Sequence, residues 1–167
     1  SSSIWKYNIG QATLPWAQAP SAIEYNDQQN GKMQNGSGQI ARDGRGGWWL
    51  SQYRYSSTEA VPSLIHVTYG TIDYNSGTFI GTSQQGGMAV TRDGSLLAIG
   101  RELGTVAVYE VTYTSKGRPS LKQRHVIDYG DNFGDCVTMG CEFDAAGNLY
   151  VVSPTNGRLM IFTMPNL

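Results

Sequence analysis

Charged side chains are scarce in this chain of 167 residues. Lys, Arg, Asp and Glu make up 15% of the sequence, the net charge is −1, and no basic run occurs. Because phosphate binding needs a local excess of Lys and Arg, we do not expect a nucleic-acid partner. No apolar stretch approaches the roughly 18 residues that a membrane-spanning helix needs, so we expect no membrane span.

Histidine and cysteine are also rare, with two residues of each. His66 and His125 lie in separate strand-like runs, and their spacing predicts neither a metal cluster nor a Ser-His-Asp arrangement. Cys136 and Cys141 are five positions apart, and in a straight strand their Cα atoms would be about 16 Å apart, beyond disulfide reach. We therefore favour two buried free thiols, while a disulfide would require the segment 138–140 to turn.

Glycine and tyrosine are abundant by contrast, with 21 and 10 residues. Residues 143–162 read FDAAGNLYVVSPTNGRLMIF, in which two short apolar runs are each preceded by a turn. Short apolar runs bounded by Gly, Asn or Pro are typical of paired antiparallel strands. No segment shows the sustained 3.6-residue apolar period of a helix. The sequence therefore predicts an all-β fold.

The same turn-and-strand unit occurs twice more, at residues 90–109 and 40–54. Both of these segments contain an Arg-Asp-Gly triplet, and we align the three units on Gly44, Gly94 and Gly147. These glycines are spaced 50 and 53 residues apart. Repeats of that length are found in propeller blades and solenoids.

The motif GNLYV at 147–151, followed by N-x-RL-x-IF at 156–162, resembles an NHL-type or YVTN-like β-propeller blade. It departs from that pattern at Ser153, where Asp is usual. The resemblance implies a propeller segment of about three to four blades, each a four-stranded antiparallel sheet. The repeats also resemble the C-terminal part of secreted or surface propeller proteins of Bacteroidetes-type bacteria, which implies an extracytoplasmic location. A β-sandwich with similar turns is the alternative fold.

The predicted organisation is a single propeller segment over residues 1–167. Residues 1–38 supply outer strands of one blade and a loop, 39–86 and 87–136 form two blades, and 137–167 form an incomplete blade. Closed propellers have about four to eight blades. We therefore expect a companion chain, or the remainder of a longer chain, to complete the propeller.

The most aromatic stretch supplies the candidate ligand-binding residues, which are Trp48, Trp49, Tyr53 and Tyr55. Strand alternation places Trp48 and Trp49 on opposite faces. One of the two should pack between blades, and the other could form a platform for a sugar ring or for a side chain of a partner. The alternative is that both indoles pack between blades.

Three aspartates in the sequence DYGDNFGDC, at Asp128, Asp131 and Asp135, are the candidate metal ligands. Carboxylate oxygens at this density could bind Ca²⁺, although the spacing is not that of an EF-hand loop. The alternative is an inter-blade loop in which these residues cap turns. No other cofactor is suggested.

No catalytic constellation is visible, so we predict a non-enzymatic binding or assembly module that recognises a protein or a glycan through propeller loops. One alternative is a metal-dependent hydrolase or lyase of lactonase type, with its site in the central channel and the three aspartates as ligands. Another alternative is a structural segment of a larger surface or particle assembly.

Overall fold

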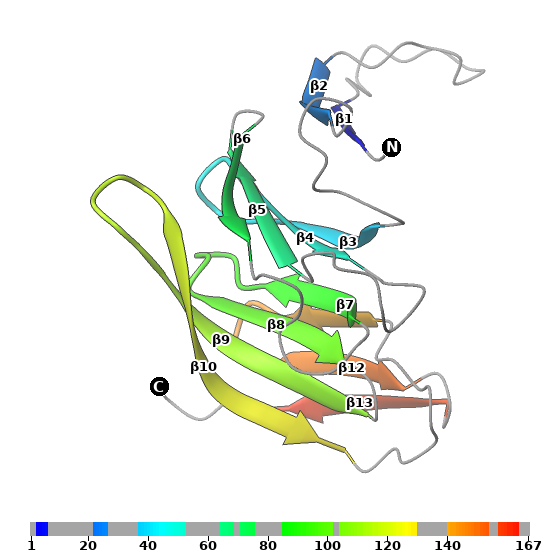
Figure 1. The fold of residues 1–167 in the computed structure, drawn as a ribbon. Coiled ribbons are helices and arrows are strands. Elements are labelled where there is room, and N and C mark those ends of the chain that lie inside the picture. The colour runs from blue at the N-terminus through cyan, green and yellow to red at the C-terminus, as the bar shows by residue number, and fades with distance from the viewer. Residues whose placement is uncertain are drawn as a thin grey trace, which may run out of the picture.

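The structure, a computed structural model, describes residues 3–6, 22–26, 37–52, 64–68, 71–75, 85–101, 104–129, 140–153 and 157–163. These residues form thirteen strands and no helix (Figure 1). The strands are β1 (Ser3–Lys6), β2 (Ala22–Asn26), β3 (Ser37–Arg42), β4 (Trp48–Gln52), β5 (Leu64–Thr68), β6 (Thr71–Asn75), β7 (Gln85–Val90), β8 (Leu96–Arg101), β9 (Thr105–Tyr113), β10 (Pro119–Asp128), β11 (Gly140–Phe143), β12 (Leu149–Ser153) and β13 (Arg158–Phe162).

The strands pair in sequence order, so each sheet is an antiparallel meander. β3–β6 and β7–β10 form four-stranded sheets, β11–β13 form a three-stranded sheet, and β1 pairs with β2. Every strand pair is antiparallel. The prediction of an all-β fold is confirmed.

The sheet β7–β10 lies between the other two sheets and contributes to both main hydrophobic cores (Figure 1). Towards β3–β6, its Leu97 and Ile99 pack with Trp49 and Leu64. On its opposite side, small residues such as Ala98 pack against β11–β13. Alternation along each strand of the middle sheet therefore supplies two apolar faces, as sheet-on-sheet packing requires.

The first strands of the three sheets lie next to one another, because β3 contacts β7 and β7 contacts β11. The side chain of Gln39 on β3 accepts a hydrogen bond from the N–H of Met88 on β7, at 2.7 Å. The turns that follow β3 and β7 also touch, and a Cβ atom on Gly94 would lie 2.1 Å from the carbonyl oxygen of Asp43. Strand β3, with the weakly strand-like sequence SGQIAR, precedes β4 and contacts β7 of the next sheet.

The alignment of the units on Gly44 was also wrong. The residues that open the three equivalent turns are Asp43, Thr91 and Asp144, which directly follow the pairs formed by β3, β7 and β11. The left-handed glycines near the ends of these turns are Gly46, Gly94 and Gly147, with φ of 99°, 75° and 85°. The Arg-Asp-Gly triplets therefore occupy different positions: Asp43 opens its turn, whereas Asp93 lies in the middle of a turn that is one residue longer.

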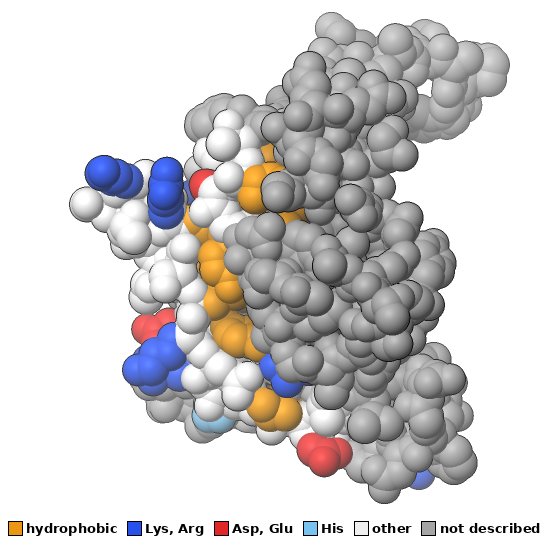
Figure 2. Space-filling view, in the orientation of Figure 1, with side chains coloured by type: hydrophobic (Ala, Val, Ile, Leu, Met, Phe, Trp, Pro, Cys, Tyr) orange, Lys and Arg blue, Asp and Glu red, His pale blue; other side chains and the backbone are white. Residues whose placement is uncertain are grey.

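The hairpin of β9 and β10 is the longest in the described part of the chain (Figure 1). Its tip is exposed and carries the basic side chains of Lys116 and Arg118. Figure 2 shows Lys and Arg side chains projecting where Figure 1 places this hairpin. None of the described residues lies in a helix of the length and apolarity that a membrane crossing needs.

Candidate functional site

A buried polar cluster begins at the turn between β3 and β4. Asp43 follows β3 directly, and its Oδ1 accepts hydrogen bonds from the N–H groups of Arg45 at 2.6 Å and Gly47 at 2.9 Å. A carboxylate that caps its own turn in this way fixes the backbone of the turn. Only 2% of Asp43 is exposed to solvent, so the second oxygen of its carboxylate also needs a partner within the protein.

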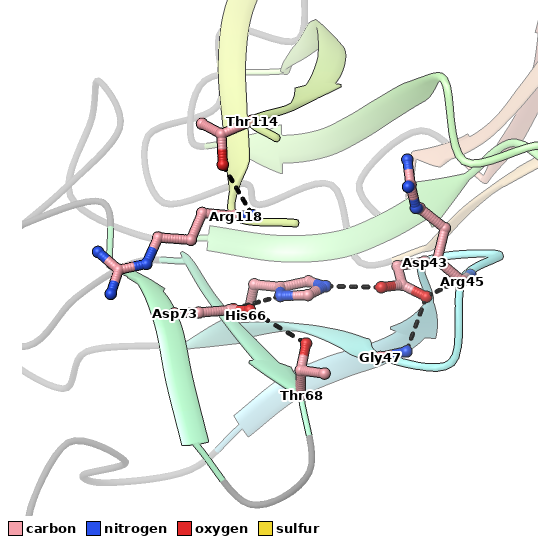
Figure 3. Close-up of polar contacts among 8 residues, drawn as sticks. All are labelled: Asp43, Arg45, Gly47, His66, Thr68, Asp73, Thr114 and Arg118. Carbon is pink, nitrogen blue, oxygen red and sulfur yellow. Dashed lines mark hydrogen bonds and ion pairs between the residues drawn. The ribbon is translucent and has the colours of Figure 1, made fainter. Parts of the chain in front are cut away.

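That partner is His66 of β5, the centre of the cluster (Figure 3). Nε2 of His66 lies 2.8 Å from Oδ2 of Asp43, and Nδ1 lies 2.5 Å from Oδ1 of Asp73 on β6. The hydroxyl of Thr68 donates to the other oxygen of Asp73 at 3.1 Å. His66 is 1% exposed, so its ring bridges two carboxylates inside the protein.

Both ring nitrogens of His66 lie at hydrogen-bond distance from a carboxylate. An imidazole donates from both nitrogens only as the imidazolium, and here both nitrogens face carboxylate oxygens. Burial raises the pKa of Asp43, but the N–H of Arg45, the ring of His66 and the N–H of Gly47 outweigh burial and hold the pKa below its usual value of 3.8. The cluster therefore places one imidazole between two carboxylates, a geometry in which a doubly protonated ring donates a charge-assisted hydrogen bond to each of them.

The surroundings of the cluster leave no space for substitution. A Cβ atom on Gly47 would lie 2.6 Å from Oδ2 of Asp43 and 2.9 Å from the ring of His66. The indole of Trp49 packs edge-on against His66, with ring centroids 4.7 Å apart. On the neighbouring sheet, the ring of Tyr113 lies under the guanidinium of Arg45, 4.1 Å from its centre. The cluster therefore joins the first sheet to the second.

The chemistry of this cluster is that of a structural clamp. His66 has both nitrogens occupied by carboxylates, so neither nitrogen is available to take a proton from a substrate. The hydroxyl of Thr68 donates to Asp73 rather than to the imidazole. Within the described ranges, no group of three or more His, Cys, Asp or Glu residues could hold a metal ion.

A second feature, a groove of about 340 Å³, opens where the first strands of the three sheets meet. Its lining includes Ile40 and Arg42 of β3, Val90 of β7, Arg92 of the following turn, and Glu142 of β11. The guanidinium of Arg42 lies over the ring of Trp48, 5.1 Å from the ring centre, a cation–π contact that limits its movement. The volume lies within the range of small-ligand sites, and two positive side chains and one negative side chain border it.

The two predicted ligand-binding tryptophans lie on opposite faces of β4, as alternation predicts. Trp49 is fully buried between the first and second sheets, so its indole offers no surface to a ligand in this structure. Trp48 is half-buried on the other face, where it packs beside Leu50 and Val67 and carries Arg42. Tyr53 and Tyr55 lie outside the described residues.

The predicted metal ligands are only partly described. Asp128 is exposed at the end of β10, paired in the ladder with Thr105, while Asp131 and Asp135 lie outside the described ranges. Cys141 is a buried free thiol, and burial, with the nearby charge of Glu142, raises its pKa to about 12. Cys136 also lies outside the described residues.

Local sequence patterns carry little sign of the two sites that the structure assembles. Arg42 and Arg92 belong to the repeated Arg-Asp-Gly triplet, but the triplet alone does not bring their side chains to one groove. His66 was interpreted as an ordinary strand residue, because Asp43 lies 23 positions before it. A buried histidine in the run LIHVT needs polar partners, and that requirement was the available signal.

No protein-family model matches this chain, and no curated protein sequence matches it.

Proposed function

We propose that this chain is a segment of a β-propeller and works as a non-enzymatic binding or assembly module for a protein or glycan partner. Three meander sheets packed face to face, with their first strands adjacent, support the propeller arrangement. As the resemblance implies, further blades come from a companion chain or from the rest of a longer chain, and the location is extracytoplasmic.

The observation that carries the binding role is the groove at the first strands. Two guanidinium groups at one groove favour a ligand with acceptor oxygens, because planar Arg side chains pair with carboxylates through two parallel hydrogen bonds. Ile40 and Val90 supply apolar surface beside them. The groove therefore suits a small acidic group of a partner, such as an acidic side chain of a protein or an acidic sugar of a glycan.

The groove is tested with the double variant Arg42→Ala/Arg92→Ala. Binding of the purified chain to immobilised panels of acidic and neutral glycans and of peptides is measured first, and the affinity for the best acidic ligand follows. Loss of hydrogen bonds to charged groups, each worth about 1.5–3 kcal/mol, should weaken that ligand roughly tenfold or more. The matched control is Arg118→Ala/Arg158→Ala, which removes the same charge from exposed positions outside the groove lining. Equal losses in both variants would mean that exposed Arg side chains in general, rather than the groove, attract the acidic ligand.

The lactonase-type alternative needs a metal, and the assay that decides it is elemental analysis of the purified chain. A stoichiometric Ca²⁺ ion that is lost in Asp128→Asn would favour an enzyme or a Ca²⁺-stabilised loop over a metal-free binding module. A structural segment of a larger assembly is the other alternative. In that case the chain would co-purify tightly with a partner, and the groove variants would not alter that association.

A further inference from the structure

The third sheet has one face that packs against β7–β10 and another that is solvent-exposed. The exposed face, which we name the outer face, consists of Glu142, Tyr150, Val152, Leu159 and Ile161. Val152 pairs with Leu159, and Tyr150 pairs with Ile161, so these four side chains lie beside one another. The exposed fractions of Val152, Leu159 and Ile161 are 46%, 63% and 57%. Adjacent apolar side chains at this exposure favour a docking surface.

Strand register shows what lies at the same positions in the other two sheets. Tyr150 pairs with Ile161 on the second and third strands of the third sheet. The corresponding pair is Trp49 with His66 in the first sheet. In the second sheet it is Ala98 with Val108. Val152 pairs with Leu159 in the third sheet. The corresponding pair is Ser51 with Leu64 in the first sheet and Gly100 with Val106 in the second. The outer face is thus the third copy of a face that the chain presents twice before.

Both earlier copies of this face are covered by the next sheet along the chain. Trp49 and Leu64 are fully buried against β7–β10. Val106 and Val108 are fully buried against β11–β13. In the third sheet Tyr150, Val152, Leu159 and Ile161 occupy these positions, and no described sheet covers them. Among the described sheets, this face is therefore covered twice and left uncovered the third time.

We propose that the outer face is the docking surface for a further antiparallel β-sheet of the same kind, supplied by a partner other than a second copy of this chain. The inference rests on the assembly role proposed above. A second copy stacked in the same direction would have to offer the opposite face of its first sheet, at Leu50, Ile65 and Val67. Those residues are at most 2% exposed in the single chain, so that face is already covered.

The side chains of the outer face indicate what the partner sheet presents. Tyr150, Leu159 and Ile161 are large, as Trp49, His66 and Leu64 are in the first sheet, whereas the second sheet has Ala98, Val106 and Val108. The first sheet is covered by aliphatic residues of the middle sheet, including Leu97, Ile99 and Ala107. The partner should therefore present a similar aliphatic face, and the middle sheet of this chain is a suitable probe for it.

The first test asks whether the outer face is free in the chain as it exists. The variant Leu159→Lys/Ile161→Lys should fold, and its midpoint of thermal unfolding should change by no more than about 2–3 °C, because exposed substitutions cost little. Val126→Lys is the matched control, since Val126 is 47% exposed on β10, outside the outer face. Unfolding of the double variant alone would show that the face is already covered and would overturn the proposal.

The second test supplies a sheet. The full chain is extended beyond Leu167 by a flexible linker and a repeat of residues 85–129, and a thiol is placed at Leu159→Cys in a Cys136→Ser background. This thiol should react rapidly in the unextended chain and roughly tenfold or more slowly in the extended one, because packing excludes the reagent. Val126→Cys should react equally fast in both chains. Equal reactivity of Leu159→Cys in both chains overturns the proposal.

Sedimentation of the unextended chain completes the experiment. We expect a monomer. A dimer that Leu159→Lys/Ile161→Lys dissociates would assign the outer face to a second copy and would overturn the choice of partner. These outcomes are independent of the Arg42 and Arg92 assay, because neither residue lies on the outer face. Failure of the docking surface and failure of the binding groove can therefore be told apart.

Discussion

Replacing His66 with alanine tests whether the Asp43–His66–Asp73 cluster holds the first sheet together. The substitution removes the imidazole ring and leaves two carboxylates around a cavity, since His66 contacts both at hydrogen-bond distance and is 1% exposed. Breaking a buried ion pair by removing one partner costs about 3–5 kcal/mol. Because Asp43 keeps its hydrogen bonds from two backbone N–H groups, we expect the lower half of that range, about 3–4 kcal/mol.

The loss is measured by urea unfolding at pH 7, and it should also lower the thermal midpoint by about 2–4 °C per kcal/mol for a chain of this size. The pKa of Asp43 is lower in the folded protein than its usual value of 3.8. The stabilising contribution of Asp43 is therefore complete above pH 3.8 and is lost as the pH falls through the lowered pKa. A measurement at pH 7 lies well inside the stabilised range. The control is His125→Ala, because Nε2 of His125 is buried without a hydrogen-bond partner in the described part of the chain. A loss for His66→Ala no greater than that for His125→Ala would refute the clamp.

Two further predictions concern buried side chains. Trp49→Ala should lower the free energy of unfolding by about 3–5 kcal/mol, because it empties the core between two sheets. Trp48→Ala should lower it clearly less and should weaken ligand binding by freeing Arg42. Denaturant unfolding of both variants checks this, and a Trp49→Ala variant as stable as the unchanged protein would contradict the packing. Burial raises the pKa of the Cys141 thiol to about 12. In Cys136→Ser protein, this thiol should therefore resist alkylation at pH 8 while the protein is folded and should react once it is unfolded. Rapid labelling of the native state would show that Cys141 is not buried.

Strands with a strong local pattern were predictable. Residues 64–68 and 71–75 are strands β5 and β6, and apolar residues on either side of Gly70 mark both of them in the sequence. Strand β10 begins at Pro119, in a stretch without a strong apolar pattern. Its first half, PSLKQ, is mostly polar, since half of this strand faces solvent, and Pro is tolerated at the first position of a strand.

The sequence alone therefore determined the class of fold and the position of most strands, because side-chain alternation and turn residues act within a few positions of the chain. Only the tertiary structure decided the partners across sheets. Asp43 and His66 meet across a sheet, and Arg42 and Arg92 reach one groove because β3 packs beside β7. The first contact depends on the order of strands within a sheet and the second on how two sheets pack, and no local pattern records either geometry. The outer face combines both sources: its alternation is local, but its exposure is visible only when the sheets are stacked.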